Sequence, residues 1–339
     1  MKFIGVDLHK QTISVCACDQ SRKILERMSL RCNQPLSITA WFQAQQPFRA
    51  VVEATASYEW FVRLIEPFAE KVVLAHPKKL RIIAESTRKS DRLDAQVLAE
   101  FLAIDMIPAS YRPTPRQRDH RKLVRYRDTV QRRITSLKNR MRWLMAEYNA
   151  DRPNLFTAPV LQAALTTPMS PADRSVFRCR SEELSFQRQQ LAAANHQLRE
   201  FARSAPIREQ EQRELLLTIP GVGFVTAEVI LAEIADIGRF TSSKQVVAYA
   251  GLAPGQRESA GKGHELHIEK QGSRHLRWIL VEAAWRLVRH SHRWQQEYLR
   301  LKAKLKAKKA IVAIARRLVG IVTAVLKSGQ PYRAAHVCV

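Results

Sequence analysis

The chain has 339 residues, enough for two domains with an additional segment, and its 46% hydrophobic and 26% charged residues are typical of folded rather than disordered proteins. Lys and Arg number 56 against 31 Asp and Glu, which gives a net charge of +25 and a pI near 10.4. This excess favours a nucleic acid as partner, because each neutralised phosphate releases counterions; a ribosomal or merely soluble basic protein is the alternative on charge alone.

The cysteines and the hydropathy pattern exclude several protein classes. The five cysteines form no CxxC pair and no Cys/His cluster with zinc spacing, so neither a zinc site nor a disulfide framework is expected. No signal-peptide pattern opens the sequence. The most apolar late stretch, 311–326, is interrupted by Arg316 and Arg317, which argues against a transmembrane helix. We therefore expect a soluble protein of a reducing compartment, without a membrane partner.

The first domain, residues 1–110, is predicted to be a mixed α/β sheet of the RNase H type. Apolar alternation predicts strands at 2–8, 12–18, 23–30, 49–54 and 72–75, and helical spacing predicts helices at 36–45, 57–69 and about 91–104. Three consecutive strands with tight connections indicate an antiparallel start. The later alternation of helix and strand indicates a mixed sheet.

Four carboxylates in this domain are placed where a metal site would need them. Asp7 and Glu53 end two apolar strands, and Asp91 and Asp94 open a helix, on one face of it. Each has an ordinary interpretation alone, as a turn cap, a helix cap or an ion-pair partner. Together they predict a site for two Mg²⁺ ions, because magnesium prefers hard oxygen ligands and paired ions activate phosphoryl transfer.

The segment Gly5-x-Asp7-x-x-Lys10 also resembles the first phosphate loop of actin-like ATPases and sugar kinases. Those proteins need later glycine-rich loops for phosphate and adenosine. None occurs between residues 50 and 200, so this interpretation is discounted.

The middle of the chain, residues 111–207, is predicted to be a basic coiled-coil segment. Apolar residues mostly three or four apart run through 119–148 and again from Leu184 to Phe201, with a proline-bearing break between the two helices. The two helices can pair with each other or with another subunit, and the sequence does not choose.

The last domain, residues 208–339, is predicted to be mainly helical. The run Ile219-Pro220-Gly221-Val222-Gly223 followed by a helix over 226–234 indicates a helix-hairpin-helix, whose turn amides suit a DNA phosphate; an ordinary packing corner is the alternative. Further on, Ser259 lies in a loop rich in glycine and basic residues. Such a loop admits a phosphodiester, although a turn role for the serine is the simpler interpretation of composition.

Taken in order, these residues resemble the insertion-sequence 110 family of DEDD transposases, which includes Piv-type DNA invertases and bridge-RNA-guided recombinases. The resemblance covers essentially the whole chain. It rests on six segments in the family's order: GVDLHK at 5–10, EATASY at 53–58, KSDRLDA at 89–95, IPGVG at 219–223, AGLAP at 250–254 and KQGSRHLR at 270–277.

The resemblance implies a RuvC-like domain with Asp7, Glu53, Asp91 and Asp94 as its metal site, and a transposase domain with Ser259 as its nucleophile. It further implies a phosphoserine–DNA intermediate, a site shared between subunits of a dimer or tetramer, an element-encoded bridge RNA, and a cytoplasmic, nucleoid-associated bacterial or archaeal protein. Ala56 and Ala260 stand where the family usually has glycine. Ser273, in a segment where the family commonly has asparagine, is the second candidate for the nucleophile.

The basic residues complete the prediction. Twelve Lys and Arg lie between Arg112 and Arg142 against two Asp, and a second cluster runs from Arg300 to Arg317. With so few acids to balance them, we interpret these runs as faces that bind a nucleic-acid backbone rather than as solvated helix faces. The residues expected to contact nucleic acid are Lys10, Lys89, Arg92, Arg121, Lys122, Arg125, Arg132, Arg133, Lys138, Arg140, Gly221, Gly223, Arg257, Lys262, Lys270, Arg274 and Arg277.

The sequence therefore predicts an enzyme of DNA strand exchange. Two alternatives remain open at this point. A RuvC-like junction nuclease would use metal-activated water and would not need Ser259, and a non-catalytic nucleic-acid-binding protein would need neither Ser259 nor Asp7.

Overall fold

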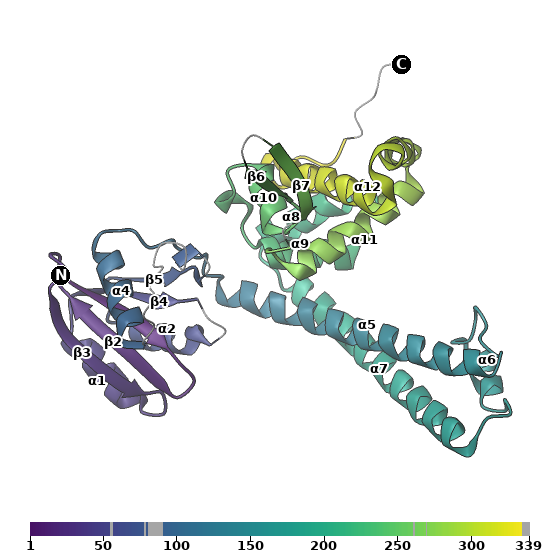
Figure 1. Ribbon diagram of the computed structural model, residues 1–339, viewed down its shortest axis with the longest axis horizontal. Coiled ribbons are helices and arrows are strands. Elements are labelled where there is room, and N and C mark those ends of the chain that lie inside the picture. Colours follow the sequence, from purple (N-terminus) through teal and green to yellow (C-terminus); the bar gives the residue numbers. More distant parts are fainter. Residues whose placement is uncertain (55–56, 78, 81–90, 260–261, 269, 334–339) are drawn as a thin grey trace. The chain divides into compact units, whose positions relative to one another are not determined.

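The computed structural model describes residues 1–54, 57–77, 79–80, 91–259, 262–268 and 270–333, with the backbone alone at 91–93, 256–259 and 262–267. The chain divides into two compact units, Met1–Arg112 and Pro113–Val339 (Figure 1). Residues 1–110, predicted as the first domain, lie within the first unit. The predicted segments 111–207 and 208–339 lie together in the second unit.

The first unit is built on a five-stranded mixed sheet. Its strands are β1 (Lys2–Leu8), β2 (Thr12–Cys18), β3 (Ile24–Arg31), β4 (Phe48–Glu53) and β5 (Lys71–Ala75), in the order β3-β2-β1-β4-β5. β1, β2 and β3 pair antiparallel, whereas β4 pairs parallel with β1 and β5 parallel with β4. The predicted antiparallel start and mixed sheet are therefore confirmed.

Helices cover both faces of this sheet. α1 (Pro35–Ala44) and α2 (Tyr58–Ile65) bury Phe42 and Phe61 against one face, where Ile4 and Val6 of β1 also lie. α4 (Asp91–Ala103) packs on the opposite face, in a second core that contains Phe3. Because side chains alternate along a strand, even-numbered residues of β1 meet α1 and α2 and odd-numbered ones meet α4.

The second unit begins with two long paired helices, α5 (Pro115–Glu147) and α7 (Pro171–Arg203), with the short α6 (Ala158–Ala164) between them. Their apolar residues form one core that includes Ile134, Met141 and Leu184, so the two helices pair with each other. α7 begins thirteen residues before the apolar spacing that predicts it, because Ser170 caps its first turn and Pro171 occupies the first helical position.

The rest of this unit is a helical bundle formed by α8 (Ile207–Leu217), α9 (Phe224–Ile234), a 3-10 turn (Ile237–Arg239), α10 (Ser243–Tyr249), α11 (Arg274–His290) and α12 (His292–Ser328). An antiparallel hairpin of β6 (Pro254–Ser259) and β7 (Lys262–Ile268) precedes α11. Val124 of α5 and Leu198 of α7 belong to the core of this bundle, which joins the paired helices to it. Among the described residues, none of the helices has the length and apolar character needed to cross a membrane.

Candidate active site

Two of the four predicted metal ligands lie side by side at the ends of neighbouring strands. β1 and β4 run parallel with Val6 opposite Val52, so Asp7 and Glu53 are the next residues in register. Both are odd-numbered, like Phe3 and Val51, which lie in the core under α4. Alternation therefore directs both carboxylates to the sheet face that α4 covers.

α4 is held against this face at a very short distance from β1. A Cβ added to Gly5 would lie 2.0 Å from the carbonyl oxygen of Ala95 and 2.5 Å from the amide nitrogen of Ala99. Just beyond the C-terminal end of α4, Asp105 pairs with Arg49 at the start of β4, at 2.9 Å. α4 thus runs antiparallel to β4, and its first turn lies toward the strand ends that carry Asp7 and Glu53.

The other two predicted ligands belong to that first turn of α4. Asp91 opens the helix one turn before Ala95, and Asp94 directly precedes Ala95 and is exposed. The side chain of Asp91, like all of Lys89 and the side chain of Arg92, lies outside the described residues. The backbone therefore brings the four positions toward one end of the sheet, but the side chains that the structure describes do not themselves form a group of three or more metal ligands.

Asp7 is buried, with 8% of its surface exposed. Its Oδ2 lies 3.0 Å from Nε2 of His9, a residue that the sequence interpretation did not select. In the sequence, His9 could have been identified as a partner of Asp7 because it follows that carboxylate by two residues, at the end of a predicted strand. A buried carboxylate needs donors or a cation to offset its lost hydration, so the chemistry of these oxygen ligands fits a divalent ion.

The predicted nucleophile lies at the end of a β-hairpin. Ser259 is the last residue of β6 and is paired in register with Lys262, the first residue of β7. The side chains of Ser259, Arg257 and Lys262 lie outside the described residues.

The base of this hairpin is fixed by two glycines. Gly251 has a φ of +65°, and a Cβ added to Gly272 would lie 2.0 Å from the carbonyl oxygen of Tyr249. The amide of Ser273 donates to the same carbonyl at 2.7 Å. The segments on either side of the hairpin are thus joined backbone to backbone, with no room for side chains at these positions.

Ser273, the second candidate for the nucleophile, caps a helix and is hydrogen-bonded to a buried carboxylate. It is the N-cap of α11, where its Oγ accepts from the amide of Leu276 at 3.1 Å, and the same hydroxyl donates to Oε2 of Glu233 at 2.9 Å. The carboxylate of Glu233 is fully buried and also accepts two hydrogen bonds from Arg125. The Ser273 hydroxyl is therefore engaged as both acceptor and donor within the fold.

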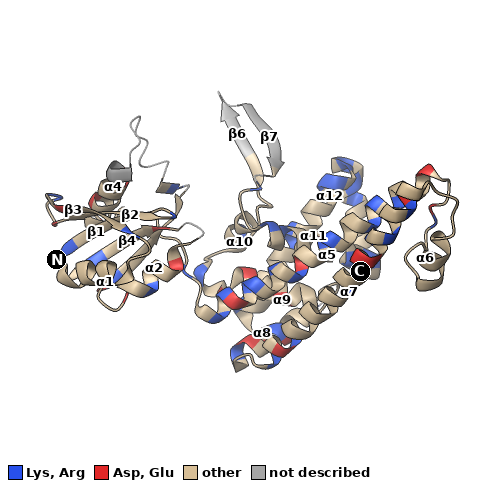
Figure 2. Ribbon diagram, turned by 90° about the horizontal axis from the view of Figure 1, so that it is seen from below, with Lys and Arg blue, Asp and Glu red and all other residues tan. Residues whose placement is uncertain are grey.

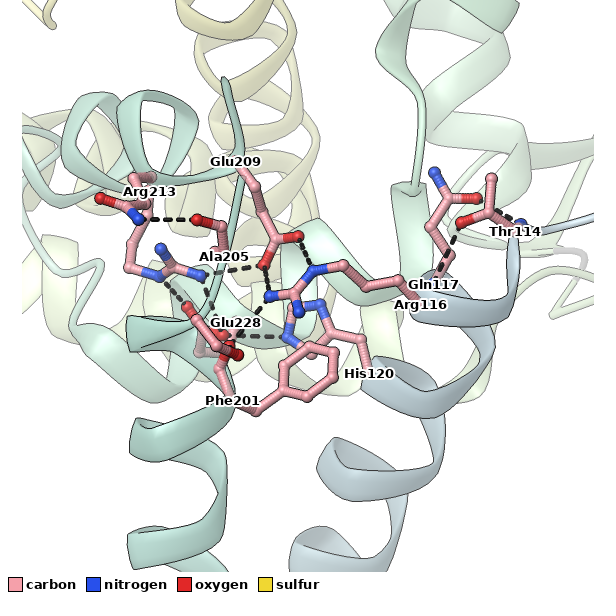
Figure 3. Close-up of polar contacts among 11 residues, drawn as sticks. Thr114, Arg116, Gln117, His120, Phe201, Ala205, Glu209, Arg213 and Glu228 are labelled. Carbon is pink, nitrogen blue, oxygen red and sulfur yellow. Dashed lines mark hydrogen bonds and ion pairs between the residues drawn. The ribbon is translucent and has the colours of Figure 1, made fainter. Parts of the chain in front are cut away.

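A buried polar network anchors α5 and α8 to α9 (Figure 3). Glu228, fully buried, accepts from Nε2 of His120 at 2.9 Å and from Arg213. Glu209 accepts from Arg213 and, through both its oxygens, from Arg116. Burial tends to raise the pKa of Glu228, but the hydrogen bonds from His120 and Arg213 outweigh it and hold the pKa below its usual value.

Sequence reasoning did not select Glu228 or Glu233. Both stand in an otherwise apolar helix, FVTAEVILAEI, all of which from Thr226 to Ile234 is buried. Acidic residues inside such a helix are the signal, because a buried carboxylate requires a cationic partner. The partners are arginines and a histidine from other helices, which no local pattern identifies.

Many of the basic residues predicted to face nucleic acid contact the protein itself. Arg125 pairs with Glu233, Arg121 donates to the carbonyls of Ala232 and Glu233, and Arg132 pairs with Asp128. Arg277 donates to the carbonyl of Ala250, at 3.3 Å. These arginines therefore form hydrogen bonds and ion pairs that stabilise the second unit.

A second group carries charge without such a buried partner among the described residues. Lys10, Lys270 and Arg274 are exposed, and Lys122 pairs with the exposed Asp119. Within the described part of the chain no carboxylate pairs with Arg133, Lys138 or Arg140 of α5. Figure 2 shows the spread of basic residues along this helix. These positions remain the stronger predictions for contact with a nucleic-acid backbone.

The two glycines of the predicted hairpin motif differ in environment. Gly221 has a φ of +82°, and a Cβ there would lie 2.9 Å from both the carbonyl of Ala283 and the amide of Leu287 on α11. Gly223 is the exposed N-cap of α9, with open space around its Cβ position. Gly221 thus serves close packing of the α8–α9 corner, and contact of this corner with DNA stays a prediction.

Comparison with known proteins identifies both parts of the chain. The transposase model DEDD_Tnp_IS110 matches residues 4–150, and the model described as Transposase IS116/IS110/IS902 family matches residues 213–300. The chain is 28% identical to the transposase for insertion sequence element IS1111A of Coxiella burnetii, over 98% of this chain and 92% of that protein. It is 26% identical to the pilin gene-inverting protein of Moraxella bovis, over 97% of each chain.

Proposed function

Because this chain belongs to the IS110 family of transposases, enzymes that cleave and rejoin DNA, we propose that it does so through a serine–DNA intermediate formed with the help of a carboxylate-bound metal site. The observation that carries the metal part of this proposal is the register of β1 and β4. It directs Asp7 and Glu53 to the face where α4 begins with Asp91 and Asp94.

We infer that the first unit is an RNase H-like, RuvC-type domain. Its antiparallel β1–β3 followed by parallel β4 and β5, with helices on both faces, supports this assignment. Asp7, Glu53, Asp91 and Asp94 would hold the divalent ion that the DEDD family implies, which we propose is Mg²⁺ because all four donors are hard oxygens. When bound, Mg²⁺ supplies Lewis acidity toward phosphate and lowers the pKa of a coordinated hydroxyl. His9 would orient the Asp7 carboxylate through its hydrogen bond.

Ser259 would supply the attacking oxygen. As its Oγ–P bond forms, the bond from phosphorus to the leaving DNA oxygen breaks, and the serine proton ends on that oxygen as a DNA hydroxyl. A hydroxyl from the partner duplex then attacks the phosphoserine, the Oγ–P bond breaks, and the proton returns to Ser259. The placement of Ser259 at the tip of a hairpin supports this role, because the base of the hairpin is held rigidly by Gly251 and Gly272.

The partners follow from the family. DNA is the substrate that a transposase implies. We further propose a bridge RNA encoded by the element, a homo-oligomer in which the carboxylates of one subunit serve the serine of another, and a cytoplasmic location with the nucleoid. To test whether a bridge RNA is required, the protein is expressed with its native flanking DNA, purified, and digested with RNase before the cleavage assay. Unchanged cleavage after complete digestion would contradict that part of the proposal.

Covalent trapping tests the mechanism itself. The protein is expressed with its native flanking DNA, and DNA linked to protein is measured after denaturation for wild type, Ser259→Ala, Asp94→Ala and Ser273→Ala. We expect the adduct in wild type and Ser273→Ala only. Cleavage without an adduct that survives Ser259→Ala but not Asp94→Ala would instead indicate a nuclease that uses water. Strand transfer that survives Ser259→Ala and also survives Asp94→Ala would contradict both the assigned nucleophile and the assigned metal site.

A further inference from the structure

A groove of about 440 Å³ lies beside the second half of α5 and the middle of α7. Lys138 and Arg142 of α5 line one part of it, and Arg188 of α7 lines another. Phe156, from the segment between α5 and α6, is also part of its lining. Three cationic side chains from two helices therefore converge on one aromatic residue.

The cations are arranged around the Phe156 side chain and backbone. The Lys138 ammonium lies 5.2 Å and the Arg142 guanidinium carbon 5.4 Å from the centroid of the ring. Arg188 donates to the carbonyl oxygen of Phe156 at 2.9 Å. Both ring contacts are within cation–π range, so the ring holds two positive groups near each other at the groove.

Within the described part of the chain, only one of the three cations of the groove pairs with a carboxylate. Arg142 pairs with Asp151 at 3.2 Å. Among the described residues, neither Lys138 nor Arg188 pairs with a carboxylate, and the half-buried Lys138 ammonium has no hydrogen-bond acceptor. Partial burial, and then the charges of Arg188 and Arg142, lower the pKa of Lys138, which reflects positive charge left uncompensated.

The remaining lining residues offer neutral donors. Gln131, Asn139 and Asn154 carry side-chain amides, and Thr135 carries a hydroxyl. An anion in this groove would meet an ammonium, a guanidinium and amide N–H groups, a combination that suits the several acceptor oxygens of a phosphodiester. The aromatic ring adds a surface on which sugar or base can pack.

We propose that this groove binds a backbone phosphate of the DNA substrate. The inference rests on the proposed action on DNA, since that function makes DNA the polyanion the protein must hold. It assigns to the α5–α7 pair a binding role apart from the carboxylates of the first unit and from the Ser259 hairpin. The site contributes affinity and position, and no chemical step takes place in it.

The test is the salt dependence of DNA binding, measured by fluorescence anisotropy with a labelled duplex of the native flanking DNA. The variant Lys138→Gln/Arg188→Gln removes the two cations that lack a carboxylate. We expect binding about tenfold weaker at low salt, and a slope of log K against log salt reduced by about 0.9 for each phosphate that the protein no longer neutralises. Arg174→Gln/Arg178→Gln removes two exposed charges of α7 outside the groove and is the matched control.

The outcomes distinguish phosphate binding in the groove from an effect of bulk charge. An equal loss of slope in the control pair would mean that bulk charge is responsible and would overturn the proposal, as would an unchanged slope in the groove variant. Loss of affinity for RNA of the same sequence, with DNA binding intact, would overturn the assignment to DNA. Lys138→Arg changes the side chain but keeps its charge, so it should keep the wild-type slope. This variant separates loss of charge from a folding defect caused by substitution at this position. The Ser259 mechanism is scored separately, by the covalent adduct of wild type against Ser259→Ala, so its failure is distinguishable from a failure of the groove to bind DNA.

Discussion

The substitution Gly5→Ala tests whether the position of α4 sets the catalytic geometry. Gly5 lies on the face of β1 that α4 covers, two residues before Asp7. A methyl group at Gly5 would lie 2.0 Å from the carbonyl oxygen of Ala95, whereas ordinary van der Waals separation begins at 3.4 Å. Both atoms nearest to it belong to the backbone of α4, so no side-chain rotation relieves the clash.

The expected magnitude follows from this geometry. α4 must retreat from the sheet by about 1 Å or more, because a packed interior accommodates a new methyl group by moving its neighbours. Such overpacking costs about 1–3 kcal/mol of stability. Asp91 and Asp94 move with the helix while Asp7 and Glu53 stay on the strands. A misplacement of about 1 Å between catalytic groups costs about 100-fold in rate.

The assay compares DNA cleavage and covalent adduct formation by Gly5→Ala and wild type, with the free energy of unfolding measured in urea for both. Gly320→Ala is the control, because a Cβ there meets nothing within 4 Å and the residue lies inside α12. We expect the control to retain full activity and Gly5→Ala to remain folded with about 1% of it. Wild-type cleavage by folded Gly5→Ala would refute the inference that α4 positions two of the ligands.

Three further predictions follow from the second unit. Glu228→Gln should lower the free energy of unfolding by about 3 kcal/mol at neutral pH. Because the folded pKa of Glu228 lies below its usual 4.5, the wild-type protein should lose this contribution as the pH falls through that lowered pKa. Urea titrations at several pH values should therefore show a smaller acid-dependent loss of stability in the variant than in wild type. Arg133→Gln/Arg140→Gln should lower the salt slope of DNA binding by up to about 2 with the melting temperature unchanged; an unchanged slope would remove these two arginines from the DNA interface. Ser273→Ala, which deletes a helix cap and the hydrogen bond to Glu233, should cost about 1–2 kcal/mol in thermal unfolding yet keep the adduct; an adduct lost in a folded variant would make Ser273 the nucleophile.

Much of the first unit could be predicted from local pattern. Apolar alternation locates all five strands of this unit within one residue, and most residues of β1, β2 and β4 are buried. Tight connections between β1, β2 and β3 and the later alternation with helices predict an antiparallel start and a mixed sheet, whereas the pairing of β4 with β1 comes from the structure. The same pattern places Asp7 and Glu53 at strand ends, and the parallel register of β1 with β4 then makes them neighbours.

Other features depend on tertiary packing that no local pattern encodes. α7 extends back to Pro171 through a polar stretch whose Phe177 is buried in the core of the α5–α7 pair. The role of Ser273 as a cap bonded to Glu233 requires knowing that α9 lies beside α11. His9 becomes visible as a partner of Asp7 only when the exit of β1 is seen in three dimensions.

The charge of the chain illustrates the same limit. Net charge predicts a polyanionic partner, but it does not tell which cations are available to that partner. Arg121, Arg125 and Arg132 of α5 already satisfy carboxylates and carbonyls within the fold, and removing such a group takes a donor away from its acceptor. Their substitution should therefore destabilise the protein before it weakens DNA binding. The salt slope should reflect the cations that lack an internal carboxylate, Arg133 and Lys138 among them, and so fall well short of the number of basic residues on the helix.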